Sequence, residues 1–152
     1  MKWLVLIHVL SAIIGVGPTF FGHVFFRKKQ TVGDFKQSLK LSKMLEFFPK
    51  IGGSIAVLSG IALVIWSSWS FTEFWILGSI LLYIGIQVVV IGFVAPITKE
   101  LVHWVKEDNT LSDYEPLPSE QSATLSKANR YYYIASCMGT LLFILMILKP
   151  IL

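Results

Sequence analysis

Histidine supplies the strongest candidates for chemistry in this chain. Two of its three histidines, His8 and His23, lie inside an apolar run from Trp3 to Phe26 that contains no Asp, Glu, Lys or Arg. The third, His103, follows a later apolar run. Imidazole ligates metal ions and serves as an axial ligand of heme iron, whereas lipid offers it no hydrogen-bond partner. We therefore take His8, His23 and His103 as candidate metal ligands.

The spacing of the histidines limits what they can do together. His8 and His23 fall on one side of a helix, but about four turns, or roughly 22 Å, separate them, so they cannot bind one metal ion. His103 is expected at the depth of His23, which makes these two the plausible pair on different helices. The alternative for each histidine is structural, because an imidazole near a membrane interface commonly bonds to a backbone carbonyl or a lipid headgroup.

A stripe of small and polar residues accompanies the first two histidines. On a helical wheel one side of the run carries His8, Ser11, Ala12, Gly15, Thr19, Gly22 and His23. The other side is Leu, Ile, Val and Phe, so the stripe is expected to face the interior of a protein and not lipid. Gly15 would leave room for the flat face of a porphyrin beside His8. We add Ser11 and Gly15 to His8 as candidate cofactor-binding residues.

The elements that position these residues are membrane-spanning helices. The chain has 152 residues, of which 55% are hydrophobic and only 14% are charged, outside the usual balance of soluble proteins. Its apolar runs lie at about residues 3–26, 49–69, 74–96 and 131–149, each long enough to cross the hydrocarbon core. We predict one all-α domain over residues 1–152, a four-transmembrane-helix bundle. The alternative for the first run is a cleaved signal peptide with its processing site at Gly15-Val16-Gly17-Pro18, but the length of the run and the weakly basic Lys2 flank favour a span.

The distribution of basic residues predicts the orientation of the bundle. The connection at residues 67–73 has no Lys or Arg, whereas the other two connections contain Arg27, Lys28, Lys29, Lys36, Lys40, Lys43, Lys50, Lys99, Lys106, Lys127 and Arg130. By the positive-inside rule the basic connections face the cytoplasm and both termini lie outside. We expect a multi-pass protein of the cytoplasmic membrane. The pI of about 9.2 then reflects topology, and no nucleic-acid partner is expected.

The two basic connections differ in character. The first predicts a short amphipathic helix, with Thr31 or Asp34 as its N-cap, which either rests on anionic lipid headgroups or is solvated. In the second, Pro96 predicts a bend followed by an amphipathic stretch at residues 97–106. Residues 108–121 are acidic, contain two prolines and lack periodicity, so we expect a mobile loop there.

Small residues in the second and third spans predict close helix packing. Gly52, Ala56 and Gly60 recur every four residues, and Gly78, Gly85 and Gly92 every seven. Such spacing lets helix backbones approach each other, either within one bundle or between chains. A homo-oligomer or a membrane-protein partner is therefore an open expectation.

Polar side chains deep in the later spans need partners. Tyr83 and Gln87 lie one turn apart in the third span, where they either bond to each other as structural glue or contact a ligand. We include both among the candidate cofactor-binding residues. In the fourth span, one mildly polar face is expected to meet the histidine stripe or Tyr83 and Gln87; it consists of Tyr133, Ser136, Cys137 and Thr140. The lone Cys137 is expected to be a packing residue.

The order of these features resembles a known family. A histidine in the first span, then Gly15-Val16-Gly17-Pro18 with Phe20-Phe21, a basic connection and glycine-rich second and third spans are similar to the bacterial integral membrane proteins of domain of unknown function family 2269. The resemblance covers essentially the whole chain. More distantly, the opening LIHVLSAIIGVGPTFF is similar to the first helix of the copper-resistance protein D family and of the bacterial membrane protoporphyrinogen oxidase.

The second resemblance implies heme or porphyrin binding, with His8 matching the first-helix histidine of the oxidase. Unlike that oxidase group, this chain has no His, Lys or Arg from Trp75 to Ile97, so porphyrinogen oxidation is not expected. Copper handling is not expected either, because there is no Met/His cluster outside the spans.

These observations predict a small membrane protein that binds heme b or a related hydrophobic cofactor, with His8 as an axial ligand and a possible link to redox chemistry. One alternative is a non-enzymatic scaffold or accessory subunit of a membrane complex. Another is a small-molecule or ion transporter. Motifs of hydrolytic or nucleotide-binding enzymes are absent from the sequence, which leaves the question of an enzymatic activity open.

Overall fold

The computed structural model describes residues 1–107 and 111–150. Its helices are α1 (Lys2–Phe25), α2 (Val32–Leu45), α3 (Phe47–Trp66), α4 (Phe74–Gln87), the π-helix η1 (Val88–Val94), α5 (Ala95–Glu107) and α6 (Ser119–Leu148). Within the described residues, four helical stretches are long and apolar enough to cross a membrane: Lys2–Phe25, Val32–Trp66, Phe74–Glu107 and Ser119–Leu148. The prediction of an all-α bundle with four spans is confirmed.

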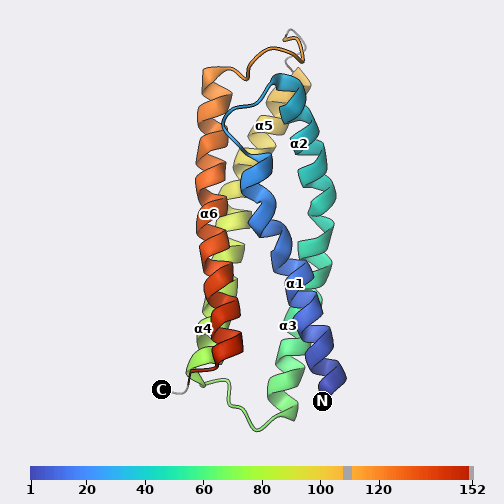
Figure 1. The fold of residues 1–152 in the computed structure, drawn as a ribbon, viewed down its shortest axis with the longest axis vertical. Helices are drawn as coiled ribbons and strands as arrows, with labels where there is room; N and C mark the ends of the chain where they lie inside the picture. The colour runs from blue at the N-terminus through green and yellow to red at the C-terminus, as the bar shows by residue number, and fades with distance from the viewer. Residues whose placement is uncertain (108–110, 151–152) are drawn as a thin grey trace.

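Two of these stretches join shorter helices end to end. Glu46, between α2 and α3, has right-handed helical angles (φ −59°, ψ −21°), so the two helices form one rod (Figure 1). The predicted amphipathic helix α2 is confirmed, and Thr31 is its N-cap, accepting a hydrogen bond from the Asp34 backbone N–H at 3.2 Å. α2 therefore continues the line of α3 and is not a separate helix set at an angle to it.

The third span continues past Pro96 in a similar way. Proline lacks an N–H, and in a regular helix its ring clashes with the carbonyl four residues earlier. Here the π-helix η1 widens the backbone just before Pro96, and the Ala95 N–H bonds to Val90 O, five residues back. The helix therefore passes from α4 through η1 into α5 without ending.

The four rods pack as two pairs that α1 connects. α1 packs mainly against α3 and also against α6, while α4 packs against α6. Figure 1 shows α1 running diagonally from the side of α3 toward α6, with the start of α1 and the end of α6 at the same end of the molecule. We call this the terminal end, and the opposite end the cap.

The cap consists of the α1–α2 connection at residues 26–31, α2, α5, residues 111–118 and the first turns of α6 (Figure 1). It contains the largest fully buried side chains among the described residues: Phe26, Val32, Phe35, Leu101 and Leu125. Leu39, Leu117 and Ala128 complete this core. Together these side chains form one of the two clusters of buried apolar residues in the part of the chain that the structure describes.

The acidic segment is part of the cap. Its backbone pairs with the start of α2: the Val32 N–H bonds to Glu115 O at 2.9 Å, the Gly33 N–H to Asp113 O at 3.0 Å, and the Leu117 N–H to Gln30 O at 3.2 Å. Residues 111–118 form a loop, as predicted, and these hydrogen bonds join the loop to the start of α2; the mobility of the loop stays a prediction. Residues 108–110 lie outside the described residues, and residues 119–121 begin α6.

Candidate functional site

The imidazole of His8 is held by α3. Its Nδ1 lies 2.9 Å from the backbone oxygen of Ala56 and 3.2 Å from the hydroxyl of Ser59. A carbonyl oxygen only accepts, so Nδ1 carries the hydrogen and donates it. The other ring nitrogen, Nε2, is then left with its lone pair. The ring is held in one orientation by these contacts, and His8 as a whole is half-buried.

A glycine provides the seat for this ring. A Cβ atom placed on Gly60 would lie 3.0 Å from His8 Cε1, tighter than nearly all real contacts. The imidazole therefore lies against bare backbone, one turn beyond Ala56. The sequence signal was the four-residue repeat of Gly52, Ala56 and Gly60, which indicated packing. The sequence did not indicate that Ala56, Ser59 and Gly60 contact His8.

Gly15 does not provide room for a porphyrin. A Cβ atom on Gly15 would lie 2.5 Å from the Gly53 backbone nitrogen, and one on Gly52 would lie 2.7 Å from the Gly15 nitrogen. The space predicted for a cofactor is filled by the backbone of α3, because glycines on both helices let them touch. Ser11 lies on the same face and donates its hydroxyl hydrogen to His8 O at 3.0 Å within its own helix.

Tyr83 and Gln87 lie on another part of the bundle interior. They are one helical turn apart on α4. The Tyr83 hydroxyl oxygen reaches α3, where it would lie 2.8 Å from a Cβ atom on Gly53. The Tyr83 contact connects α4 with α3, and the role of Tyr83 and Gln87 as structural glue or as ligand contacts stays a prediction.

The other two histidines have different neighbours. His23 stacks on Tyr133 of α6, with ring centroids 5.0 Å apart and planes inclined by 24°. Its Nδ1 is buried and has no hydrogen-bond partner among the described residues. His103 is exposed on α5, where its Nδ1 lies 3.0 Å from a carboxylate oxygen of Glu107. The two rings predicted to form a pair thus contact separate groups.

The polar face of α6 meets the histidine stripe, as one predicted alternative has it. Besides the stacking of Tyr133 on His23, the Ser136 hydroxyl donates to Thr19 O of α1 at 3.2 Å. Cys137 and Thr140 are exposed, and Thr140 bonds to Ser136 O within its own helix. The face therefore links helices where it touches α1.

Most glycines of the predicted packing seams are used inside the chain. Gly52 meets Gly15, Gly60 meets His8, and a Cβ atom on Gly78 would lie 3.0 Å from Leu145 Cδ1. Gly85 contacts Met138, whereas Gly92 has nothing within 4 Å. The seams that could have joined two chains are thus largely filled by neighbouring helices of the same chain.

The arrangement offers single oriented histidines and no metal cluster. Within residues 1–107 and 111–150, no group of three or more His, Cys, Asp or Glu side chains could hold a metal ion. This finding concerns sites in which several side chains bind one metal ion. It does not bear on an axial ligand of heme, which needs only one imidazole.

Comparisons with known proteins give one match. No curated protein and no solved structure matches the chain. A family model described as "Predicted integral membrane protein (DUF2269)" matches residues 2–150, nearly the whole chain. The family resemblance drawn from the residues is confirmed, whereas the more distant one to the copper-resistance group is not among the matches. The chain belongs to the DUF2269 family of predicted integral membrane proteins.

Proposed function

We propose that this protein binds heme b within its helical bundle, with Nε2 of His8 as an axial ligand of the iron. The observation that carries the proposal is the hydrogen bond from His8 Nδ1 to Ala56 O. Metal-ligating histidines almost always donate their other ring N–H to a carbonyl or carboxylate, which sets the tautomer and raises the basicity of the ligand. His8 has this arrangement, since its Nδ1 donates to Ala56 O and its Nε2 keeps a free lone pair.

The residues around His8 fit an axial ligand, with one change to the expected position of the macrocycle. Ala56 O and Ser59 orient the ring and Gly60 provides its seat. The region beside Gly15 is filled by α3, so a porphyrin would bind on the Nε2 side of His8. When bound, heme b supplies one-electron redox chemistry. The protein's own part would be to orient the imidazole and to keep water away from it.

The orientation of the bundle forms part of this proposal. The basic connections lie at the cap and next to it, whereas the connection at residues 67–73 of the terminal end lacks Lys and Arg. The positive-inside rule then puts the cap in the cytoplasm of a bacterial cell and both termini outside. His8 would lie in the outer half of the cytoplasmic membrane.

An absorption spectrum tests the assignment. The protein, purified in mild detergent and supplied with heme, is expected to show a Soret band that co-elutes with it. The band should disappear in His8→Ala and also in His8→Gln, whose side-chain amide still offers a hydrogen to Ala56 O but binds iron poorly. His103→Gln, which changes an exposed histidine, is the matched control and should keep the band.

Two results would overturn the proposal. One is the absence of a Soret band after heme supplementation of the correctly folded wild type. The other is a band in His8→Gln equal to that of the wild type, with circular dichroism and elution volume unchanged in both proteins.

A further inference from the structure

We propose that a basic pocket on the cap binds a phosphate-bearing anion. The pocket has a volume of about 540 Å³ and lies between the α1–α2 connection, the segment from Tyr114 to Leu117, and the second turn of α6 at Ser122. It is distant in sequence from His8 and does not depend on heme. Its volume lies within the range of about 300–1,000 Å³ that is typical of small-molecule sites.

The pocket has two lysine side chains that form no ion pair with a carboxylate of residues 1–107 or 111–150. Lys28 and Lys29 both line it. Neighbouring cations have partners, because Arg27 lies 3.8 Å from Asp34 and Lys36 lies 2.7 Å from Asp113. Among the described residues, neither Lys28 nor Lys29 has a carboxylate within the 4.0 Å of an ion pair. Asp34 also lines the pocket, but Arg27 offsets its charge.

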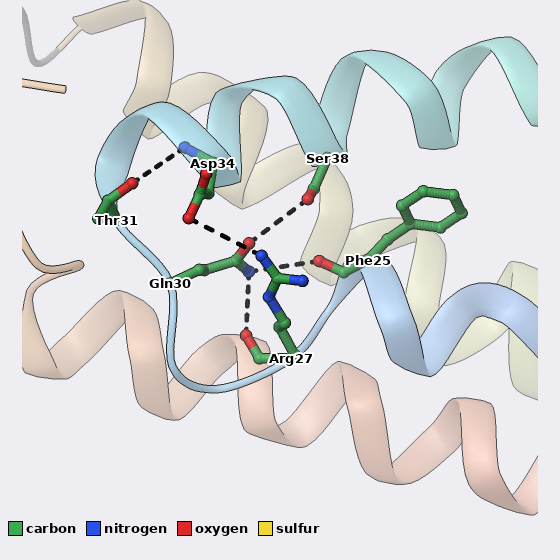
Figure 2. A network of polar contacts seen from close by, with 6 residues as sticks. All are labelled: Phe25, Arg27, Gln30, Thr31, Asp34 and Ser38. Carbon is green, nitrogen blue, oxygen red and sulfur yellow. Dashed lines mark hydrogen bonds and ion pairs between the residues drawn. The ribbon is translucent and has the colours of Figure 1, made fainter. Parts of the chain in front are cut away.

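The connection that presents these lysines is held in place by a buried glutamine. The Gln30 side chain, only 9% exposed, donates to Phe25 O at 3.3 Å and to Arg27 O at 3.0 Å, and it accepts from the Ser38 hydroxyl at 3.4 Å (Figure 2). On the other side, the Ser122 hydroxyl donates to Lys28 O at 3.3 Å. The backbone is thus ordered before a ligand arrives, which lowers the entropic cost of binding.

The available groups suit phosphate chemistry. Lysine binds phosphate as a point charge, and two adjacent lysines can bind one dianion. Thr31 also lines the pocket, and its hydroxyl oxygen accepts from the Asp34 N–H, so its own hydrogen is available to a ligand. The connection directly follows α1, so the phosphate could belong to a lipid headgroup or to a soluble compound. Both sources share the same recognition chemistry.

Thermal unfolding in detergent tests the site with two probes, inorganic phosphate and short-chain phosphatidylglycerol. Each is compared with chloride, or with phosphatidylcholine of the same chain length, at equal ionic strength. At least one probe should raise the Tm of the wild type by about 3 °C, the size expected for a modest binding free energy. The rise should be lost in Lys28→Gln/Lys29→Gln and kept in Lys40→Gln/Lys43→Gln, which removes the same charge from exposed positions of α2.

The two probes distinguish the sources. A rise with inorganic phosphate supports a soluble ligand, and a rise with phosphatidylglycerol alone supports a lipid headgroup. Amine labelling of the wild type, read by mass spectrometry, is a second measurement that needs no variant, and bound probe should protect Lys28 and Lys29 more than Lys40 and Lys43. Equal protection of the four lysines, or an equal Tm rise in the two double variants, would overturn the proposal.

Discussion

The α1–α3 crossing and the cap are packed by opposite means. At the crossing, Gly15 meets Gly52 and Gly53 so closely that any Cβ atom would overlap backbone. In the cap, large side chains such as Phe26 and Phe35 are 0–1% exposed and fill the space between helices. At the crossing, glycines let the two backbones touch. In the cap, large side chains hold the backbones apart.

The two kinds of packing match what two different surroundings favour. Between helices in lipid there is no hydrophobic driving force, so association depends on close van der Waals contact, which small residues permit. Outside the lipid, apolar side chains are driven together by water, at about 25 cal/mol per Å² of buried apolar surface. The packing of α1 against α3 therefore matches that of helices in lipid, and the packing of the cap matches that of a domain in water.

The largest expected effect is in the cap. Phe35→Ala removes a side chain that is 0% exposed, and it should lower the free energy of unfolding by about 3–5 kcal/mol through lost burial and a cavity. Met44→Ala on the same helix, where the side chain is 64% exposed, should change it by about 0.5 kcal/mol or less. Titration with SDS in mixed micelles measures both. Equal losses would show that the cap has no water-excluding core.

A smaller but sharper effect is expected at the crossing. Gly15→Ala puts a methyl group against the α3 backbone, which cannot rotate away, and should cost about 1–3 kcal/mol. Gly17→Ala, two positions along the same helix, has nothing within 4 Å and should be neutral or slightly stabilising because alanine favours helix. The same SDS titration compares the two. If both substitutions behave alike, the backbone contact is not what joins α1 to α3.

The three hydrogen bonds of the Gln30 side chain should contribute less to the free energy of unfolding. Gln30→Ala removes three hydrogen bonds and leaves Phe25 O and Arg27 O without these partners, for an expected loss of about 1–2 kcal/mol. Gln37→Ala changes an exposed glutamine of α2 and serves as its control. Hydrogen exchange should increase locally at the α1–α2 connection in the first variant and not in the second. Unchanged hydrogen exchange at the connection would show that Gln30 does not hold it in place.

The smallest effect is expected for the ion pair between Lys36 and Asp113. It links the acidic segment to α2, but its side chains are 36% and 63% exposed, so it should contribute less than about 1 kcal/mol. A double-mutant cycle with Lys36→Gln and Asp113→Asn measures the coupling, which should shrink in high salt. A coupling that is larger and insensitive to salt would mean that this edge of the cap excludes water.

Local features of the sequence predicted much of the fold. The apolar runs indicate four spans, because a backbone in lipid must satisfy its own hydrogen bonds and does so as a helix. Thr31, one of the two predicted caps, is the N-cap of α2. The histidine stripe predicts that one side of α1 faces other helices, and Ser11, Ala12, Gly15, Thr19 and Gly22 are indeed buried.

Other predictions could not be made from local patterns. Gly15 suggested space for a cofactor, but space beside a glycine is available only if no other backbone takes it. Residues 108–121 suggested a loop, but not the pairing of the segment at 113–117 with the start of α2, because such pairing involves no periodicity of its own. Likewise, the sequence did not indicate that Gln30 orders the connection next to Lys28 and Lys29.

The amino-acid sequence alone therefore determined that this protein is a helical membrane protein of four spans with histidines on a protein-facing side. Spans and faces depend on the chemistry of neighbouring residues along one helix, which composition and period encode. Only the tertiary structure decided that His8 donates to Ala56, 48 positions away, and that Lys36 pairs with Asp113, 77 positions away. Such contacts depend on which helices meet and at what height, and no local pattern specifies that.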